Sequence, residues 1–245
     1  NIKKRFFNVN NENNYLFAFD LRLWYNVIYI VNRLEAVIMI GKFITIEGND
    51  GSGKTTVLEG IKRALIAQGF DVLVTREPGG SEIAEKIRQV ILDKSNLAMD
   101  KRTEALLYAA SRRQHIIETV LPALNANKIV LCDRYIDSSL TYQGYARGIG
   151  IEEVYQMNVF ATEGLLPDLT IYIAVRPSVG ITRKSKQKEL DRLEMETISF
   201  HEKVYEGYEK LVQMYPNRIV RIDGERFAEA VIADATKVVN EFINQ

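Results

Sequence analysis

The chain has 245 residues, of which 47% are hydrophobic and 26% are charged, so it is long enough to form one α/β domain with a full hydrophobic core. Its 32 Lys and Arg balance its 32 Asp and Glu, and a zero net charge argues against a dedicated nucleic-acid or membrane-surface binder. The single cysteine, Cys132, excludes an intramolecular disulfide, and one free thiol suits a reducing cytoplasm. Cys132 lies in an apolar run, which predicts a small, buried core residue.

Residues 1–38 differ in composition from the rest of the chain. Asn, Ile, Lys, Phe and Tyr fill 21 of these 38 positions, and the segment contains no Gly and no Pro. We expect Met39 to be the natural start and residues 1–38 to be a non-native or upstream-translated extension; the alternative is a genuine N-terminal helix or anchor. The most apolar part, residues 16–31, is interrupted by Asp20 and Arg22 and is shorter than the roughly 20 residues of a membrane span. We therefore expect neither a transmembrane helix nor a signal peptide here.

From residue 42 onward, short β-rich runs alternate with segments of helical periodicity. Runs of β-branched and aliphatic residues predict strands at 42–47, 71–75, 128–132, 168–175 and 218–222. Apolar spacing on one face predicts a helix that ends near Gly69, a long helix over 103–124 and a closing helix over 228–243. Such alternation implies right-handed crossovers and helices on both faces of a parallel sheet. The sequence therefore predicts an α/β fold with one five-stranded parallel domain over 39–245, whose ligands bind beyond the carboxyl ends of the strands.

A glycine-rich motif stands between the first predicted strand and the helix after it, and it fits G-x-x-x-x-G-K-[ST]. The residues expected to bind ATP are Gly48, Asn49, Asp50, Gly51, Ser52, Gly53, Lys54, Thr55 and Thr56. The glycines let successive backbone N–H groups face one anion, and the helix N-terminus adds partial positive charge. Lys54 can reach the β- and γ-phosphates, and the Thr55 hydroxyl can ligate Mg²⁺. The alternative is a chance match. Otherwise the motif indicates a nucleoside triphosphate site, which kinases, ATPases and GTPases share. The lack of an N-K-x-D motif disfavours a GTPase.

Two arginines follow the second and third predicted strands. Arg76 comes directly after Thr75, and Arg134 comes shortly after Cys132. Because the carboxyl ends of parallel strands meet at one edge of a sheet, both arginines should emerge beside the glycine-rich motif. Two arginines there can hold a second phosphate group by bidentate hydrogen bonds, which an enzyme that only hydrolyses ATP does not need. The alternative is that both arginines pair with surface carboxylates.

Aromatic and polar side chains indicate a pocket for a base. Tyr108 and Arg112 are four residues apart on the long predicted helix and share a face, so a ring and a guanidinium could stack on a base and hydrogen-bond to it. Ser138 and Gln143, after the third predicted strand, could add polar contacts. For each of these residues alone, the alternative is an ordinary core-edge or surface position.

A cationic stretch over residues 183–192 follows the fourth predicted strand. Such a run of charges is usually a solvated helix face. The same run could instead form a mobile lid, over about 183–195, whose lysines and arginines close over the transferring phosphoryl group.

Five ordered motifs resemble those of bacterial thymidylate kinases, which belong to the P-loop nucleoside monophosphate kinases. They are EG-x-D-G-x-GKTT at Glu47–Thr56, TREPGG at Thr75–Gly80, LLYAASRR at Leu106–Arg113, DRY-x-x-SS-x-x-YQG at Asp133–Gly144 and LDR at Leu190–Arg192. The resemblance runs from about residue 42 to the C-terminus and leaves residues 1–38 outside. It implies a P-loop NTPase fold with a small lid segment, ATP and dTMP as substrates, Mg²⁺ as cofactor, and a homodimer in the cytoplasm.

The resemblance also implies roles for particular residues. Arg76 and Arg134 match the arginines that hold the dTMP phosphate, and Asp50 matches a loop aspartate that contacts the acceptor's sugar region. Tyr108 matches the aromatic residue that stacks on thymine, and Arg112 matches the arginine that hydrogen-bonds to it. The remaining dTMP-binding residues of the same pocket are Ser138, Tyr142 and Gln143.

The metal site and the catalytic cations follow from the same resemblance. Asp133 lies where an acidic group supports Mg²⁺, partly through water, together with Thr55. Some members of the family carry a basic residue at the position of Gly51, and this chain resembles the other type, whose cation comes from the lid. Many lid-type members have an R-G pair before LDR, where this chain has Gln187-Lys188. The expected catalytic residues are Lys54, Asp50, Arg134, Lys186, Lys188 and Arg192, with Arg183 nearby.

The implied reaction is ATP + dTMP → ADP + dTDP, with an oxygen of the acceptor phosphate as nucleophile. Because the second pKa of a phosphate monoester is about 6, this oxygen is largely ionised at neutral pH and needs no general base. The two histidines, His115 and His201, are accordingly expected at surface or helix-face positions. The alternatives are a kinase for another monophosphate or a nucleoside, a P-loop switch protein without an acceptor, and an inactive product if residues 1–38 disturb the first strand.

Overall fold

The computed structural model describes residues 41–184 and 191–244. All of them lie in one compact unit that spans Met39–Gln245. Residues 1–38, which we expect to be an extension, lie outside the described residues, as does the middle of the lid expected over 183–195. The natural start at Met39 therefore stays a prediction.

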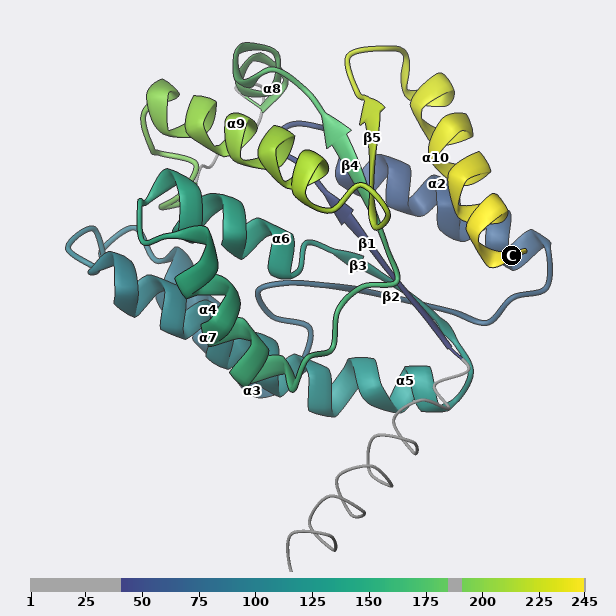
Figure 1. Cartoon of the computed structure of the whole chain (residues 1–245), viewed down its shortest axis with the longest axis horizontal. Coiled ribbons are helices and arrows are strands. Elements are labelled where there is room, and N and C mark those ends of the chain that lie inside the picture. The colour runs from purple at the N-terminus through teal and green to yellow at the C-terminus, as the bar shows by residue number, and fades with distance from the viewer. Residues whose placement is uncertain (1–40, 185–190, 245) are drawn as a thin grey trace, which may run out of the picture. The chain divides into compact units, whose positions relative to one another are not determined.

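Within the described residues, five strands form one sheet in the order β2-β3-β1-β4-β5, and all four pairings are parallel. The strands are β1 Lys42–Glu47, β2 Val72–Arg76, β3 Ile129–Asp133, β4 Leu169–Ala174 and β5 Ile219–Asp223. The predicted five-stranded parallel sheet is thus confirmed, and each strand overlaps the run predicted for it. Because β1 is the central strand, the loop that follows it leaves from the middle of the sheet (Figure 1).

Successive residues of the strands face opposite sides of the sheet, which gives the domain two hydrophobic cores. On one side, Ile44 and Ile46 of β1 pack with α2 (Lys54–Ala67) and α10 (Ala228–Ile243), which also contact each other (Figure 1). On the other side, Cys132 of β3 lies fully buried in the second core, as predicted, and burial raises the pKa of its thiol. Helices therefore cover both faces of the sheet.

The other helices in the described residues are α3 Glu82–Leu92, α4 Lys101–His115, the π-helical η1 Ile116–Val120, α5 Leu121–Asn125, α6 Ile136–Ser139, the π-helical η2 Leu140–Ala146, α7 Ile151–Thr162, α8 Pro177–Lys184 and α9 Ile198–Met214. The long helix predicted over 103–124 corresponds to α4, η1 and α5 in succession. It begins where Asp100 accepts hydrogen bonds from the N–H groups of Arg102 and Thr103, at 2.9 and 3.2 Å. No helix of the described residues is both long and apolar enough to cross a membrane.

Candidate active site

A cavity of about 580 Å³ opens at the carboxyl ends of β1, β2 and β3. All the residues predicted to hold the acceptor line it: Asp50, Arg76, Tyr108, Arg112, Arg134, Ser138, Tyr142 and Gln143. The glycine-rich loop and the first turn of α2 contribute Asp50, Gly51, Gly53, Lys54, Thr55 and Thr56, whereas Gly48, Asn49 and Ser52 lie outside the wall. The fold therefore brings the predicted triphosphate site and the predicted acceptor site into one cavity.

The glycine-rich loop turns through backbone conformations that favour glycine. Gly48, Gly51 and Gly53 have φ angles of +148°, +76° and +89°. Gly53 is the N-cap of α2 and provides no side-chain cap, so the first N–H groups of this helix form a site suited to an anion. The Lys54 ammonium donates to the carbonyl oxygens of Gly48 and Asn49 at 3.0 and 2.9 Å. Burial penalises the charged ammonium and lowers the pKa of Lys54 to about 8.

The glycine-rich loop touches α8 through two glycines. A Cβ atom on Gly51 would lie 2.2 Å from the carbonyl oxygen of Gly180, and a Cβ atom on Gly180 would lie 2.5 Å from the carbonyl oxygen of Asp50. Real Cβ atoms do not approach backbone oxygens so closely, so the two backbones meet only because both residues are glycine. The loop therefore has no room for a side chain at Gly51.

Thr55 and Asp133 bring two oxygen atoms together at the cavity wall. The Thr55 hydroxyl donates to Asp133 Oδ2 at 3.3 Å. Mg²⁺ prefers oxygen ligands, and proteins often hold it by one or two such groups together with waters and substrate phosphates. The pair predicted from the sequence therefore fits this ion.

Three side chains hold the Arg134 guanidinium, two of them from distant parts of the chain. Its Nη2 donates to Asp50 Oδ1 at 2.7 Å, and its Nη1 donates to the hydroxyls of Ser138 and Tyr208 at 3.1 and 3.4 Å. The guanidinium also lies 5.2 Å from the centre of the Tyr142 ring, whose hydroxyl donates to Asp50 Oδ2 at 3.1 Å. The φ angle of Arg134 is +69°, so the turn that places it at the cavity carries local backbone strain.

Arg76, at the end of β2, is held less tightly. Its guanidinium pairs with Glu85 of α3 at 3.0 Å and donates to the carbonyl oxygen of Pro78 at 3.0 Å. The side chain is 48% exposed. Arg76 thus pairs with a partly exposed carboxylate while it lines the cavity, whereas Arg134 binds the partly buried Asp50.

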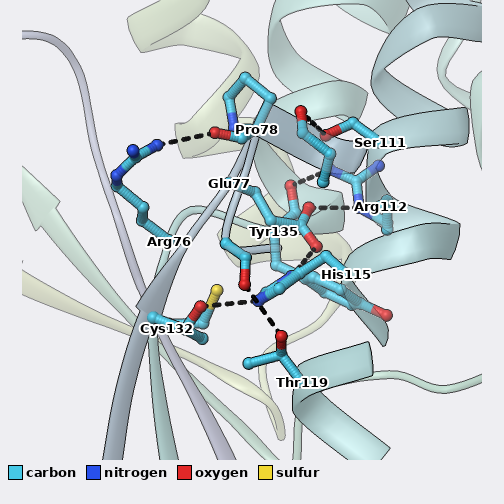
Figure 2. A network of polar contacts seen from close by, with 12 residues as sticks. Arg76, Glu77, Pro78, Ser111, Arg112, His115, Thr119, Cys132 and Tyr135 are labelled. Atoms are coloured by element: carbon cyan, nitrogen blue, oxygen red, sulfur yellow. Dashed lines mark hydrogen bonds and ion pairs between the residues drawn. The ribbon is translucent and has the colours of Figure 1, made fainter. Parts of the chain in front are cut away.

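Arg112 is buried at the cavity wall, and its guanidinium is bound on several sides (Figure 2). Its Nε donates to Glu77 Oε2 at 2.7 Å, and its Nη2 donates to the carbonyl oxygen of Tyr135 at 2.9 Å. Its Nη1 donates to the Ser139 hydroxyl at 3.0 Å and to Asn158 Oδ1. These contacts use four of the five N–H groups of an arginine. A surface position for Arg112 is therefore wrong, and one N–H remains for a ligand.

Both histidines lie on helices, one of the two positions expected from the sequence, but they are buried, so the surface alternative is wrong. His115 and His201 are 0% and 5% exposed. His115 ends α4, and its Nδ1 lies 2.9 Å from Glu77 Oε1 (Figure 2). The contact with Glu77 and the place at the end of α4 give His115 a buried position that helical periodicity alone did not indicate. Neither histidine lines the cavity.

The other predicted pocket residues are also fixed by neighbours. Tyr108 is half-buried on α4, and burial raises the pKa of its phenol. Gln143 donates through Nε2 to Glu104 Oε1 at 2.9 Å, and the Ser138 hydroxyl donates to Glu47 Oε2 at 2.6 Å. Hydrogen bonds within the protein thus fix the orientation of Gln143 and Ser138 at the cavity wall.

Sequence reasoning missed three buried glutamates that hold the site together: Glu47, Glu77 and Glu104. Glu47 accepts hydrogen bonds from the Tyr135 N–H at 2.7 Å and the Tyr208 hydroxyl at 2.8 Å. Burial, together with nearby negative charge, raises the pKa of Glu47 from 4.5 to about 7. Glu47 is the last residue of β1 and Glu77 directly follows β2, so a carboxylate at the carboxyl end of a strand was the available signal.

The cations expected in the lid do not share one environment. Lys186 and Lys188 lie outside the described residues. Arg183 of α8 lines the cavity. The Arg192 side chain is only 4% exposed, lies outside the cavity wall and donates to Glu104 Oε2 at 2.7 Å, so its catalytic role stays a prediction. Its charge stabilises a buried carboxylate, which would be costly to leave unpaired.

A phosphate-binding loop that shares one cavity with a second, arginine-lined anion site defines a P-loop kinase of the nucleoside monophosphate class. The family model described as "Thymidylate kinase" matches residues 46–235, and this chain belongs to the thymidylate kinase family. The thymidylate kinases of Oceanobacillus iheyensis and Bacillus velezensis are 53% and 54% identical to it over 209 residues, which is 84% of this chain and 93% and 99% of those proteins. A crystal structure of thymidylate kinase from Ehrlichia chaffeensis matches with a TM-score of 0.66 and 31% identity, over 82% of this chain and 98% of that one. The family predicted from the motifs is thus confirmed.

Proposed function

We infer that this chain transfers the γ-phosphoryl group of ATP to the phosphate of dTMP, which yields ADP and dTDP for dTTP synthesis. The observation that carries this inference is the single cavity that joins Lys54 of the glycine-rich loop to Arg134 and Tyr108 of the acceptor side. The acceptor is supported by relatives of 53% and 54% identity that are thymidylate kinases.

The chemistry requires positioning more than proton transfer. The acceptor phosphate has a second pKa of about 6 and is already a nucleophile near neutral pH. Lys54 and the N-terminus of α2 would bind the donor phosphates, while Arg134 and Arg76 would hold the acceptor phosphate. Asp50 fixes Arg134 and faces the sugar region of the acceptor. Orientation and neutralisation of charge then lower the barrier.

Thr55 and Asp133 are the residues that would hold Mg²⁺, Asp133 partly through water. When bound, this ion neutralises charge on the β- and γ-phosphate oxygens. The 3.3 Å hydrogen bond between the two side chains supports this assignment, because it places two oxygen atoms beside the glycine-rich loop.

The base end of the cavity would take thymine between Tyr108, which stacks on the ring, and Arg112, which has one N–H left to donate. Further polar contacts would come from Ser138, Tyr142 and Gln143. Discrimination between dTMP and dUMP depends on one methyl group, which is worth only about 1–3 kcal/mol.

We also propose Lys186 and Lys188 as the catalytic cations of the lid, with Arg183 beside them, and residues 39–245 as the functional domain.

We further propose that the protein is a homodimer in the cytoplasm. Large apolar side chains on packed helices support a subunit contact, since Phe160 of α7 is 89% exposed and Leu106 of α4 is 58% exposed. Sedimentation of the wild type and of Phe160→Asp tests the dimer.

ADP release from Mg·ATP, measured in turn with dTMP, dUMP, dCMP, dGMP, AMP and UMP, tests the proposed reaction. We expect strong stimulation by dTMP, with dTDP as the product. Lys54→Ala should abolish turnover, and Arg112→Ala should mainly weaken the use of dTMP. Stimulation by another monophosphate would replace the acceptor, and slow hydrolysis without stimulation would favour a P-loop switch protein.

A further inference from the structure

We propose that His115 is a positioning residue for the acceptor phosphate, because its buried imidazole binds the residues on both sides of Arg76. The inference rests on the proposed function, in which Arg76 holds the phosphate of dTMP. His115 lies outside the cavity wall, so it would act through the loop after β2 and not by contact with a substrate.

The imidazole of His115 bridges the two chain neighbours of Arg76. Its Nε2 lies 2.7 Å from the Thr75 hydroxyl, and its Nδ1 lies 2.9 Å from Glu77 Oε1 (Figure 2). All three side chains are buried. The Glu77 carboxylate accepts from Nδ1, and Nε2 shares the second hydrogen bond with the Thr75 hydroxyl. One ring thus holds the side chains directly before and after Arg76.

This bridge matters because the Arg76 side chain has little packing of its own. It is 48% exposed, and its carboxylate partner Glu85 is 38% exposed. An exposed ion pair of this kind holds a guanidinium only weakly. The direction in which Arg76 leaves the sheet is therefore set by the neighbouring residues that His115 holds.

The rest of the loop after β2 lies along the same helical surface, formed by α4 and η1. The Gly79 N–H donates to the Ser111 hydroxyl at 3.1 Å, and the Thr119 hydroxyl donates to the Gly80 carbonyl oxygen at 2.9 Å. Ser111, His115 and Thr119 follow one another at intervals of four residues, so they share a helix face. A Cβ atom on Gly80 would lie 2.5 Å from His115 Cδ2, so the ring fits only against a glycine.

Through Glu77, the same imidazole is also linked to Arg112 at the base end of the cavity. Glu77 uses Oε1 for His115 and Oε2 for Arg112, whose Nε donates at 2.7 Å (Figure 2). A change at His115 would therefore disturb Arg76 and Arg112 together, whereas Lys54 and Thr55 lie in the first turn of α2. This geometry predicts that a change at His115 raises the KM for dTMP and leaves the KM for ATP nearly unchanged.

A double-mutant cycle tests the bridge. Thr75→Val removes the hydroxyl with little change of shape, and His115→Asn keeps a donor near Glu77 but cannot reach Thr75. Thr45→Val is the matched control, because it removes a buried 2.8 Å hydrogen bond to Thr170 elsewhere in the sheet. The KM for dTMP and the KM for ATP are measured for the wild type, both single variants, the double variant and the control.

We expect each single variant to raise the KM for dTMP about fivefold to tenfold, which corresponds to one lost buried hydrogen bond, while the KM for ATP stays within about twofold. The KM for dTMP of the double variant should not exceed that of the single variant with the higher KM, because both changes break the same bond. Multiplicative effects, equal rises for ATP and dTMP, or an unchanged KM for dTMP would overturn the proposal.

Hydrogen exchange separates this inference from the proposed reaction. If the wild type shows no dTMP-stimulated ADP release, the proposed reaction fails, but exchange in the segment 75–80 needs no substrate. Faster exchange there in both Thr75→Val and His115→Asn, and not in Thr45→Val, would support the bridge. Unchanged exchange would overturn it.

Discussion

Arg134 and Asp50 are separated by 84 positions in the chain, yet the guanidinium of one donates to the carboxylate of the other at 2.7 Å. The pair joins the turn after β3 to the glycine-rich loop after β1, and both side chains are largely shielded, at 17% and 22% exposure. We expect Asp50→Asn to lower kcat/KM for dTMP about tenfold or more, because a charge-assisted hydrogen bond becomes a weaker neutral one. Asp71→Asn, which alters a surface pair with Lys128, is the control and should leave these kinetics unchanged.

The ammonium of Lys54 links ATP binding to pH. Its pKa is lowered to about 8 by burial, so it is increasingly neutral above pH 8, while the donor phosphates need it charged. ATP binding at pH 8.5 should therefore take up part of a proton, and ATP affinity should fall by up to about tenfold per pH unit above 8. Calorimetry in two buffers of different ionisation enthalpy measures this uptake. Lys54→Met should abolish it, and the same uptake in this variant would contradict the assignment.

Glu47 makes the stability of the fold depend on pH. Because burial raises its pKa from 4.5 to about 7, the folded state holds a proton that the unfolded state has released between these values. The contribution to stability is full below pH 4.5 and is lost as the pH rises through 7, by up to about 1.4 kcal/mol per pH unit. Urea unfolding from pH 5 to pH 8 should show this slope in the wild type and not in Glu47→Gln. The surface variant Glu59→Gln should keep the slope.

Gly180 should be sensitive to the smallest substitution. Alanine normally stabilises a helix by about 0.5–1 kcal/mol relative to glycine. In α8, however, the added Cβ atom would lie 2.5 Å from the carbonyl oxygen of Asp50, so either the helix or the glycine-rich loop has to move. We expect Gly180→Ala to lower kcat about tenfold to a hundredfold without stabilising the protein, because small displacements of phosphate-binding groups are costly. Ser178→Ala, at an exposed position of the same helix, should be neutral.

Much of the fold was readable from the sequence because periodicity and glycines are local signals. The runs that became β1 and β4 are buried almost throughout, and α10 begins and ends at the predicted residues. The helices α3, α7 and α9 were not predicted; in α7 the apolar residues are spread around the helix and give little periodic signal. The predicted helix over 103–124 does contain a π-helical stretch, which hydrophobic spacing does not reveal.

The site was predictable as a set of residues but not as a set of contacts. Parallel strands bring Arg76 and Asp133 side by side in register, so their meeting follows from topology. The burial of Arg192 against Glu104 depends on residues 88 positions apart, and no local pattern indicates it. For the same reason, the sequence left open whether His115 lies at the surface, and its helix face turns out to be buried.

The four hydrogen bonds that the Arg112 guanidinium donates within the protein have a consequence for how this protein could change. An arginine that swung toward a different base would leave the buried Glu77 carboxylate without its partner, and a buried unpaired charge is severely destabilising. The base end of the cavity is therefore preorganised by folding, and dTMP binding needs little further ordering there. A variant that accepts another nucleobase would have to alter Glu77, Ser139 or Asn158 before Arg112 itself could adopt a new direction.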